Sequence, residues 1–127
     1  MNFELNTALD IQQKLLHVSS KLDMPHVVLN NIYCFRSYGS TSRAIARIWS
    51  LPRIWQMALN VKPGYCLEVI AEKFDKMSEE EQIRTLIHEL MHIPKTFSGA
   101  LVPHKTRYGR INNKSVEKIF QKYLLLK

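Results

Sequence analysis

The sequence predicts an α+β fold in which helices pack against a small antiparallel sheet. Apolar residues recur at helical spacing near both ends of the chain and in a segment after residue 78. Between the N-terminal segment and the segment after residue 78, stretches rich in Val, Ile, Tyr and Phe alternate with turn signals, which is typical of strands. With 127 residues, of which 46% are hydrophobic, the chain has the size and composition of one domain spanning residues 1–127.

The first predicted helix is followed by three predicted strands. The apolar positions of this helix step by three and four residues, and Pro25 is expected to close it. These positions are Ala8, Ile11, Leu15, Val18 and Leu22. β-branched and aromatic residues predict strands at 27–35, 44–49 and 65–74, and the second strand could resume after Pro52 over residues 54–59. Turn residues separate the strands at 37–40 and 60–64.

A second helix of about 15 residues is predicted to end near residue 92. Ser78 stands three residues before Glu81, which is the pattern of a capping box at a helix start. Pro94 disfavours helical geometry at the residue before it, so the helix should stop there. The last helix is expected to be capped by the asparagines at 112 and 113 and to carry an apolar stripe. The stripe consists of Val116, Ile119, Phe120, Tyr123 and Leu124.

The middle helix contains the sequence His88-Glu89-Leu90-Met91-His92, which reads H-E-x-x-H. Residues four apart share one face of a helix, so both imidazoles can reach one metal ion, with Glu89 beside them as a general base. The pattern is typical of metal-assisted hydrolysis, most often of a peptide bond. The alternative interpretation is a pair of surface histidines on an amphipathic helix.

A catalytic zinc site usually has three protein ligands and one open position. His104 is the first candidate for the third ligand, because the prolines and the glycine before it predict a loop that can fold back over the helix end. Glu117 on the last helix is the competing candidate, and Asp75 is a weaker one. The spacing is longer than in H-E-x-x-H-x-x-G-x-x-H, which excludes a metzincin. His17 and His26 are expected to be structural or exposed.

Three segments, residues 42–49, 51–55 and 86–99, resemble the metallopeptidase family found in archaea and their viruses and phages. The likeness covers roughly residues 5–125, and its most specific block is 88–104. The family belongs with minimal zincins and is similar to SprT-like proteases in architecture, which agrees with the predicted order of helix, three strands, metal-binding helix, loop and last helix. The resemblance implies that His88, His92 and His104 bind one zinc ion per chain. It also implies that Glu89 is the catalytic base of an endopeptidase that acts on polypeptides.

An edge strand of such a fold can align an extended peptide by adding it to the sheet. The candidates for the wall of this groove are Arg47, Trp49, Arg53 and Trp55. Alternatively, the tryptophans belong to the core and the arginines are solvated. A donor for the oxyanion of the tetrahedral intermediate is expected shortly after His104. The candidates are Arg107, Tyr108 and Arg110. Solvated loop residues are the alternative interpretation of these three.

Positive charge is concentrated in the C-terminal third of the chain. The formal net charge is +7, and residues 93–127 hold eight Lys or Arg residues against one acidic residue, Glu117. Such a segment beside an active site could attract nucleic acid, and SprT-like proteases act on DNA-linked proteins. The alternative function is therefore a basic nucleic-acid-associated module with a structural or inactive metal site, and ordinary solubilising charge is the simpler explanation. A third hypothesis is a metalloenzyme that cleaves a small amide.

The two cysteines, Cys34 and Cys66, lie in apolar, strand-like stretches. They are expected to be buried free thiols rather than a disulfide or metal ligands. No apolar segment has the length of a membrane-spanning helix, and the N-terminus lacks the basic and apolar pattern of a signal peptide. We therefore expect a cytoplasmic protein without a membrane partner.

Overall fold

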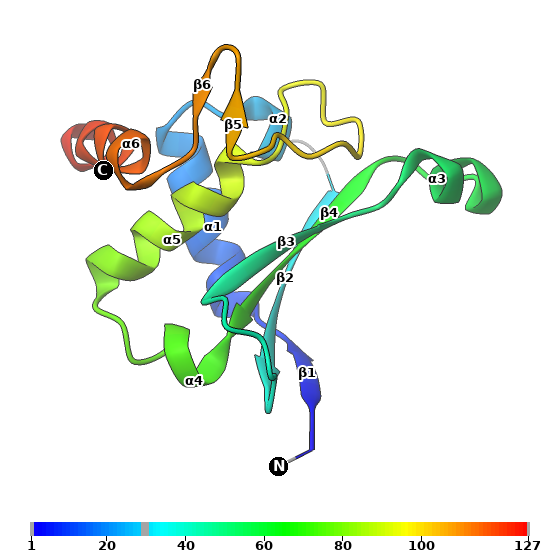
Figure 1. The fold of residues 1–127 in the computed structure, drawn as a ribbon, viewed down its shortest axis with the longest axis horizontal. Helices are drawn as coiled ribbons and strands as arrows, with labels where there is room; N and C mark the ends of the chain where they lie inside the picture. The colour runs from blue at the N-terminus through cyan, green and yellow to red at the C-terminus, as the bar shows by residue number, and fades with distance from the viewer. Residues whose placement is uncertain (1, 29–30, 127) are drawn as a thin grey trace.

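The computed structural model describes residues 2–28 and 31–126. The helices are α1 (Leu9–Lys21), α2 (Pro25–Val28), α3 (Arg53–Leu59), α4 (Ala71–Phe74), α5 (Glu79–Met91) and α6 (Asn113–Leu126). The strands are β1 (Glu4–Thr7), β2 (Asn31–Tyr38), β3 (Ala46–Ser50), β4 (Gly64–Ile70), β5 (Lys105–Thr106) and β6 (Gly109–Arg110). The predicted α+β class is confirmed, because α1 and α5 contact one sheet and α6 packs against α5 (Figure 1). None of the described helices is long and apolar enough to cross a membrane.

The main sheet has four strands in the order β1-β2-β4-β3, and it is mixed. The edge strands β1 and β3 are each antiparallel to their neighbour, whereas the central strands β2 and β4 are parallel. The prediction of three antiparallel strands is therefore wrong in number and in direction. All residues of β1 are exposed, so its sequence carries no apolar alternation. The central pair is parallel because the chain crosses over through β3 and α3 before it enters β4.

Residues 54–59, predicted as the continuation of a strand, form most of helix α3. Pro52 is the N-cap of this helix, and Asn60 closes it in the left-handed conformation with a φ of 53°. The apolar side chains that suggested a strand are exposed, Ile54 by 75% and Met57 by 72%. They stay exposed because α3 projects beyond the sheet and away from the other helices (Figure 1).

Two other predicted strands have different limits in the structure. The strand predicted at 65–74 is β4 up to Ile70 and then turns into α4, whose Phe74 is fully buried. The strand predicted at 27–35 begins at Asn31, after α2, and its positions 29 and 30 lie outside the described residues. Pro25 begins α2 rather than closing α1. Short apolar runs of this kind do not distinguish a strand from a helical turn.

The hydrophobic core lies between one face of the sheet and helices α1, α5 and α6. Leu67 and Val69 on β4 are fully buried. Helices α1 and α5 supply the facing layer, which includes Ile11, Leu15, Val18, Leu86, Ile87 and Leu90. Burial of this apolar stripe sets the rotation of α5 about its own axis, and thereby the direction in which residues 88 and 92 project.

The two cysteines lie in neighbouring strands but on opposite faces of the sheet. Cys34 is paired with Leu67, whereas Cys66 is paired with Tyr33, and paired residues of adjacent strands share a face. Both thiols are free, Cys34 being buried and Cys66 partly buried, so the prediction of free thiols is confirmed. Burial raises the pKa of the Cys34 thiol to about 12, which keeps it protonated near neutral pH.

Candidate metal centre

Both predicted ends of the motif helix α5 are confirmed. Ser78 is the N-cap, and its Oγ accepts a hydrogen bond from the Glu81 N–H at 3.2 Å. Three acidic residues occupy the first turn, where they interact favourably with the positive end of the helix dipole. His92 is the C-cap, and its N–H donates to the Glu89 carbonyl oxygen at 3.1 Å. The H-E-x-x-H sequence therefore occupies the last turns of a well-defined helix.

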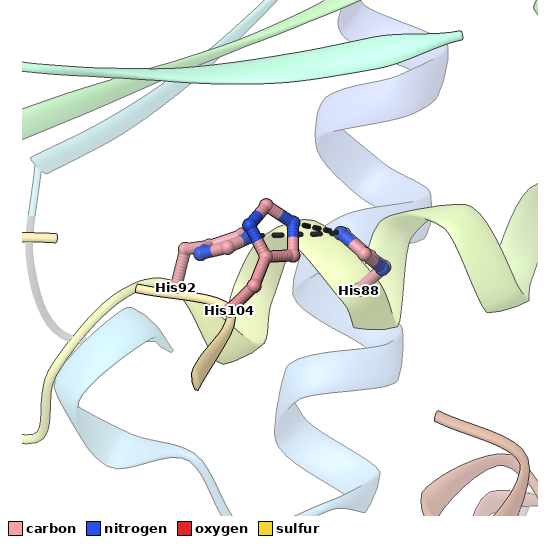
Figure 2. A group of neighbouring side chains, drawn as sticks. All are labelled: His88, His92 and His104. Carbon is pink, nitrogen blue, oxygen red and sulfur yellow. Dashed lines mark hydrogen bonds between the residues drawn. The ribbon is translucent and has the colours of Figure 1, made fainter. Parts of the chain in front are cut away.

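The structure brings His104 beside the two histidines of α5, and together they form the three-histidine group (Figure 2). The Nε2 atom of His88 lies 3.3 Å from Nε2 of His104 and 3.4 Å from Nε2 of His92. One ring nitrogen from each residue lies within 4.8 Å of the other two. His104 reaches this position because the loop after α5 folds back along the end of the helix, which was the expected path. Its role as a metal ligand stays a prediction.

His92 is held by the loop that carries His104. The Nδ1 atom of His92 lies 2.6 Å from the Val102 carbonyl oxygen, and the His92 carbonyl oxygen accepts from the Val102 N–H at 2.7 Å. Because a carbonyl oxygen only accepts hydrogen bonds, the proton of neutral His92 belongs on Nδ1. The lone pair is then on Nε2, which lies beside Nε2 of His88.

The three imidazoles fit a tetrahedral zinc ion. Two nitrogen ligands about 2.0–2.1 Å from zinc lie about 3.3–3.4 Å apart at tetrahedral angles, and the Nε2 atom of His88 has these separations from its two neighbours. Neutral imidazole is the form that binds a metal ion. Burial lowers the pKa of both His88 and His92, and neighbouring imidazoles lower it further. His88, His92 and His104 would therefore hold the ion.

The loop that ends at His104 is anchored to the sheet by Tyr65. This side chain is 2% exposed, and its hydroxyl donates to the Ala100 carbonyl oxygen at 2.6 Å and accepts from the Gly99 N–H at 2.9 Å. Its ring also stands edge-on to Phe97, with the ring centroids 4.8 Å apart. The sequence pattern assigned Tyr65 to a strand, and no local signal indicated that it holds a distant loop.

Gln56 holds the same loop from α3. Its Nε2 donates to the Leu51 carbonyl oxygen at 2.8 Å and to the Ser98 carbonyl oxygen at 3.0 Å. Gly99 packs against this contact with a φ of +95°, and a β-carbon there would overlap Gln56 Nε2 and lie 2.5 Å from the Leu51 carbonyl oxygen. The position therefore requires glycine on both conformational and steric grounds.

Replacing Gly99 with Ala should lower the affinity for zinc by about tenfold or more, because the loop must move to relieve the overlap and His104 moves with it. Competition with a chelating dye measures this affinity. Gly109→Ala is the matched control, since Gly109 also has a positive φ of +156°, but apart from its two chain neighbours no described residue has an atom within 4 Å of the added β-carbon. Equal zinc affinities for wild type and Gly99→Ala would contradict the role assigned to the loop.

Glu89 is buried beside the three-histidine group, with 8% of its surface exposed. In the part of the chain that the structure describes, its carboxylate has no hydrogen bond or ion pair. Burial raises the pKa of this carboxyl to about 7. Glu89 and His88 line the same cleft, which has a volume of about 520 Å³. A carboxyl with a pKa near neutrality is suited to accept and return a proton at neutral pH.

The raised pKa makes the stability of the metal-free protein depend on pH. The Glu89 carboxyl has a pKa of about 7 when folded against its ordinary value of 4.5, so the folded state favours the protonated form. This stabilising contribution is fully present below pH 4.5 and is lost as the pH rises through 7. Metal-free Glu89→Gln, whose amide resembles the protonated acid, should therefore be more stable than wild type in alkaline solution by up to about 3 kcal/mol. Urea unfolding of both proteins measures the difference, which should vanish in acid; its absence in alkaline solution would contradict the raised pKa.

A comparison with protein families identifies the chain. A family model described as Putative phage metallopeptidase matches residues 3–123. The chain belongs to this family. The resemblance expected from the sequence is thereby confirmed, and the three-histidine group is a candidate metal-binding site of this family member. No curated protein and no solved structure matches the chain.

In this member of the phage metallopeptidase family, the other candidate ligands make different contacts. Glu117 pairs with Arg84 at 2.7 Å, and Asp75 pairs with Arg36 at 3.0 Å. Neither carboxylate belongs to the three-histidine group. His17, which also lies outside this group, stands edge-on to an aromatic ring of α6, in agreement with a structural role.

The candidates for the substrate groove lie on the outer face of the sheet and on α3. Trp49 is 52% exposed and Trp55 is 55% exposed, so the interpretation of the tryptophans as core residues is wrong. Arg47 is not simply solvated: it donates to the buried Glu68 carboxylate at 2.8 Å, and its guanidinium lies 4.9 Å from the Trp49 ring centroid. Trp49 Nε1 donates to the same carboxylate at 2.8 Å. Arg53 begins α3.

The candidates for the oxyanion donor follow His104 in the β5–β6 hairpin. Arg107 and Tyr108 form its turn, and Arg110 ends β6. Tyr108 is 88% exposed, and the Arg107 guanidinium lies 5.6 Å from its ring centroid. A role for any of the three in stabilising an oxyanion stays a prediction.

Proposed function

We propose that the protein is a zinc-dependent endopeptidase. The observation that supports this best is the convergence of His88, His92 and His104 beside the buried Glu89, which lines the same cleft as His88. Three histidine ligands with an open position and an adjacent carboxylate are typical of catalytic zinc, whereas a structural site is closed by a fourth protein ligand. Among the described residues, the group has no fourth member.

Bound zinc would lower the pKa of a water molecule toward neutrality and polarise the scissile carbonyl. Glu89 would accept the proton of the attacking water and donate it to the leaving amine. The Val102 carbonyl would keep His92 in the tautomer that leaves Nε2 free to bind. One of the three oxyanion candidates in the β5–β6 hairpin would supply the donor for the developing negative charge.

A polypeptide substrate would bind along the free edge of β3. This strand pairs with β4 on one side, and its first residue, Ala46, lines the cleft together with His88 and Glu89. A peptide added to this edge would continue the sheet through main-chain hydrogen bonds that depend little on its sequence. The same placement would bring one peptide carbonyl beside the three-histidine group.

Zinc-dependent hydrolysis of an unfolded polypeptide is the direct test. The protein should contain about one zinc ion per chain, and hydrolysis should stop when a chelator removes the metal and resume when zinc is restored. Mass spectrometry of the fragments distinguishes internal from terminal cleavage. A zinc-loaded protein that leaves every polypeptide intact would exclude the peptidase.

We propose association with nucleic acid as a second function, on the basis of a separate basic cleft. This cleft of about 1030 Å³ is lined by Lys62, Lys95 and Lys122, which lie far apart in the sequence. Asp23 is the one acidic residue that lines it, and none of the three lysines forms an ion pair within residues 2–28 and 31–126. Unpaired ammonium groups in a cleft suit the phosphates of a nucleic-acid backbone.

Replacing all three lysines with Gln should weaken DNA binding and reduce its dependence on salt. Each lysine–phosphate contact contributes about 0.7–0.9 to the slope of log affinity against log salt, so the slope should fall by roughly two to three when three contacts are lost. Fluorescence anisotropy of a labelled oligonucleotide over a range of salt concentrations measures this slope. Lys118→Gln is the control, because Lys118 is on the same helix as Lys122 but does not line the cleft. Binding should survive Glu89→Gln, and an unchanged slope in the triple variant would exclude this cleft.

A further inference from the structure

The cleft beside His88 and Glu89 is lined by both apolar and charged side chains. It opens between the start of β3 and the helices α5 and α6, with a volume of about 520 Å³, which is ample for a side chain. We propose that it binds a substrate side chain with an apolar stem and a cationic end, so that the peptidase acts beside Lys or Arg residues. This assignment rests on the proposed endopeptidase function, because the side chain in question neighbours the scissile bond.

One part of the cleft is apolar. This wall consists of Ile45 just before β3, Ala46 at the start of β3, Met77 before α5, and Val116 on α6. Ile45 is 39% exposed, so its side chain is available for contact. The methylene stems of Lys and Arg bury well against such surfaces while their charged ends stay near polar groups.

The polar part of the cleft is acidic. Glu81 and Glu117 supply two carboxylates against the single guanidinium of Arg84, in a chain whose formal net charge is +7. Arg84 is already engaged: its Nε donates to Glu117 at 2.7 Å, and its guanidinium lies 4.2 Å from the Phe120 ring centroid. Glu81 has no ion pair in the part of the chain that the structure describes. One negative charge is therefore left uncompensated at this wall.

Glu89 is the third carboxyl group that lines the cleft. The residue as a whole is 8% exposed, it lines the cleft, and its carboxyl group has no hydrogen bond or ion pair among the described residues. A ligand that supplies a donor or a positive charge would stabilise the ionised form of such a carboxyl group. The ammonium or guanidinium of a substrate would therefore enter a cleft that is lined by three carboxyl groups and one guanidinium.

Binding of a matched peptide panel to zinc-loaded Glu89→Gln tests the preference without turnover. The peptides have blocked ends and an uncharged Ala/Ser sequence with one central Lys, Arg, Leu or Glu. Fluorescence anisotropy at physiological ionic strength should show that the Lys and Arg peptides bind about fivefold tighter than the Leu peptide, with the Glu peptide the weakest. Equal affinity for the Lys and Glu peptides, including no binding of either, would overturn the assignment.

Two charge-neutralising changes should reverse the preference. Adding Glu81→Gln and Glu117→Gln to the Glu89→Gln protein leaves Arg84 as the single charged group of this wall, so the Glu peptide should now bind more tightly than the Lys peptide. Glu80→Gln is the control, because Glu80 is an exposed residue of the same helical turn that does not line the cleft. A preference for Lys that survives the double change would exclude these carboxylates as its source.

The same panel, incubated with zinc-loaded wild type, separates this assignment from the proposed function. Selective binding without hydrolysis of any peptide would support the cationic cleft and exclude the peptidase. Hydrolysis at equal rates beside Lys, Leu and Glu would support the peptidase and exclude the cleft as its source of selectivity. Thermal unfolding of each variant establishes that it is folded at the temperature of the assay.

Discussion

Glu89→Gln should abolish peptide hydrolysis without removing zinc. The amide has the size of the carboxyl but cannot accept a proton from the attacking water, so the rate is expected to fall by about 10²–10⁴-fold. Glu89 does not belong to the three-histidine group, so the zinc content should stay at about one ion per chain. Steady-state hydrolysis and metal analysis of the same preparation measure both effects.

The carboxylate of Glu80 provides a matched control for this loss. It lies on the same helix, is exposed and does not line the cleft. Glu80→Gln therefore removes one negative charge from α5 without touching the site, and both hydrolysis and zinc content should be unchanged. Wild-type hydrolysis by Glu89→Gln would exclude Glu89 as the general base.

His104→Ala should lower the affinity for zinc by more than about a hundredfold and reduce hydrolysis accordingly. The change removes one of three converging ring nitrogens and leaves the two histidines of α5 in place. His104 is exposed, and the loop before it stays anchored by Tyr65, so the metal-free protein should unfold at an unchanged temperature. Competition with a chelating dye and thermal unfolding without metal measure the two properties separately.

Glu117→Gln distinguishes the two candidates for the third ligand. Glu117 is held by Arg84 at 2.7 Å and stands outside the three-histidine group, so the affinity for zinc should not change when its charge is removed. Full zinc affinity in His104→Ala together with a loss in Glu117→Gln would assign the third position to Glu117 instead.

The loop connects the candidate metal ligand to the body of the fold at three points. Tyr65 on β4 and Gln56 on α3 each form hydrogen bonds to the loop backbone. Val102 within the loop forms two hydrogen bonds with His92, one through its carbonyl oxygen and one through its N–H. Two of these points lie on elements that are distant in sequence from the motif. An exposed histidine on a loop of this length would otherwise lose much conformational entropy on binding a metal ion, and the anchors lower that cost.

The features that could be predicted from the sequence depend on residues close together in the chain. The start of α5 follows from Ser78 and the acidic first turn, and its end follows from Pro94, because capping and proline effects act over a few residues. The relation of His88 to His92 follows from the helix repeat alone. The return of the loop to the helix end was expected from its prolines and glycine, and His104 lies beside the motif in the structure.

The features that could not be predicted depend on pairing between distant segments. β1 has no apolar pattern, yet it forms an edge of the sheet because its backbone pairs with β2. The apolar residues of α3 suggested a strand, but Pro52 begins a helix there and no core covers it. The amino-acid composition of a segment indicates whether the segment suits a buried strand. It does not indicate which other strand will pair with it.

The sequence by itself determined the motif helix, its limits, the two histidines that share its face, and the apolar stripes of α1, α5 and α6 that pack in the core. Only the tertiary structure decided the order and direction of the strands, the anchoring of the His104 loop by Tyr65, and the placing of Glu81 and Glu117 in the cleft beside Glu89. The physical reason is the range of the interactions. Helix caps and helical periodicity act within a few residues, whereas strand pairing and the walls of a cleft join segments that the chain separates by tens of residues.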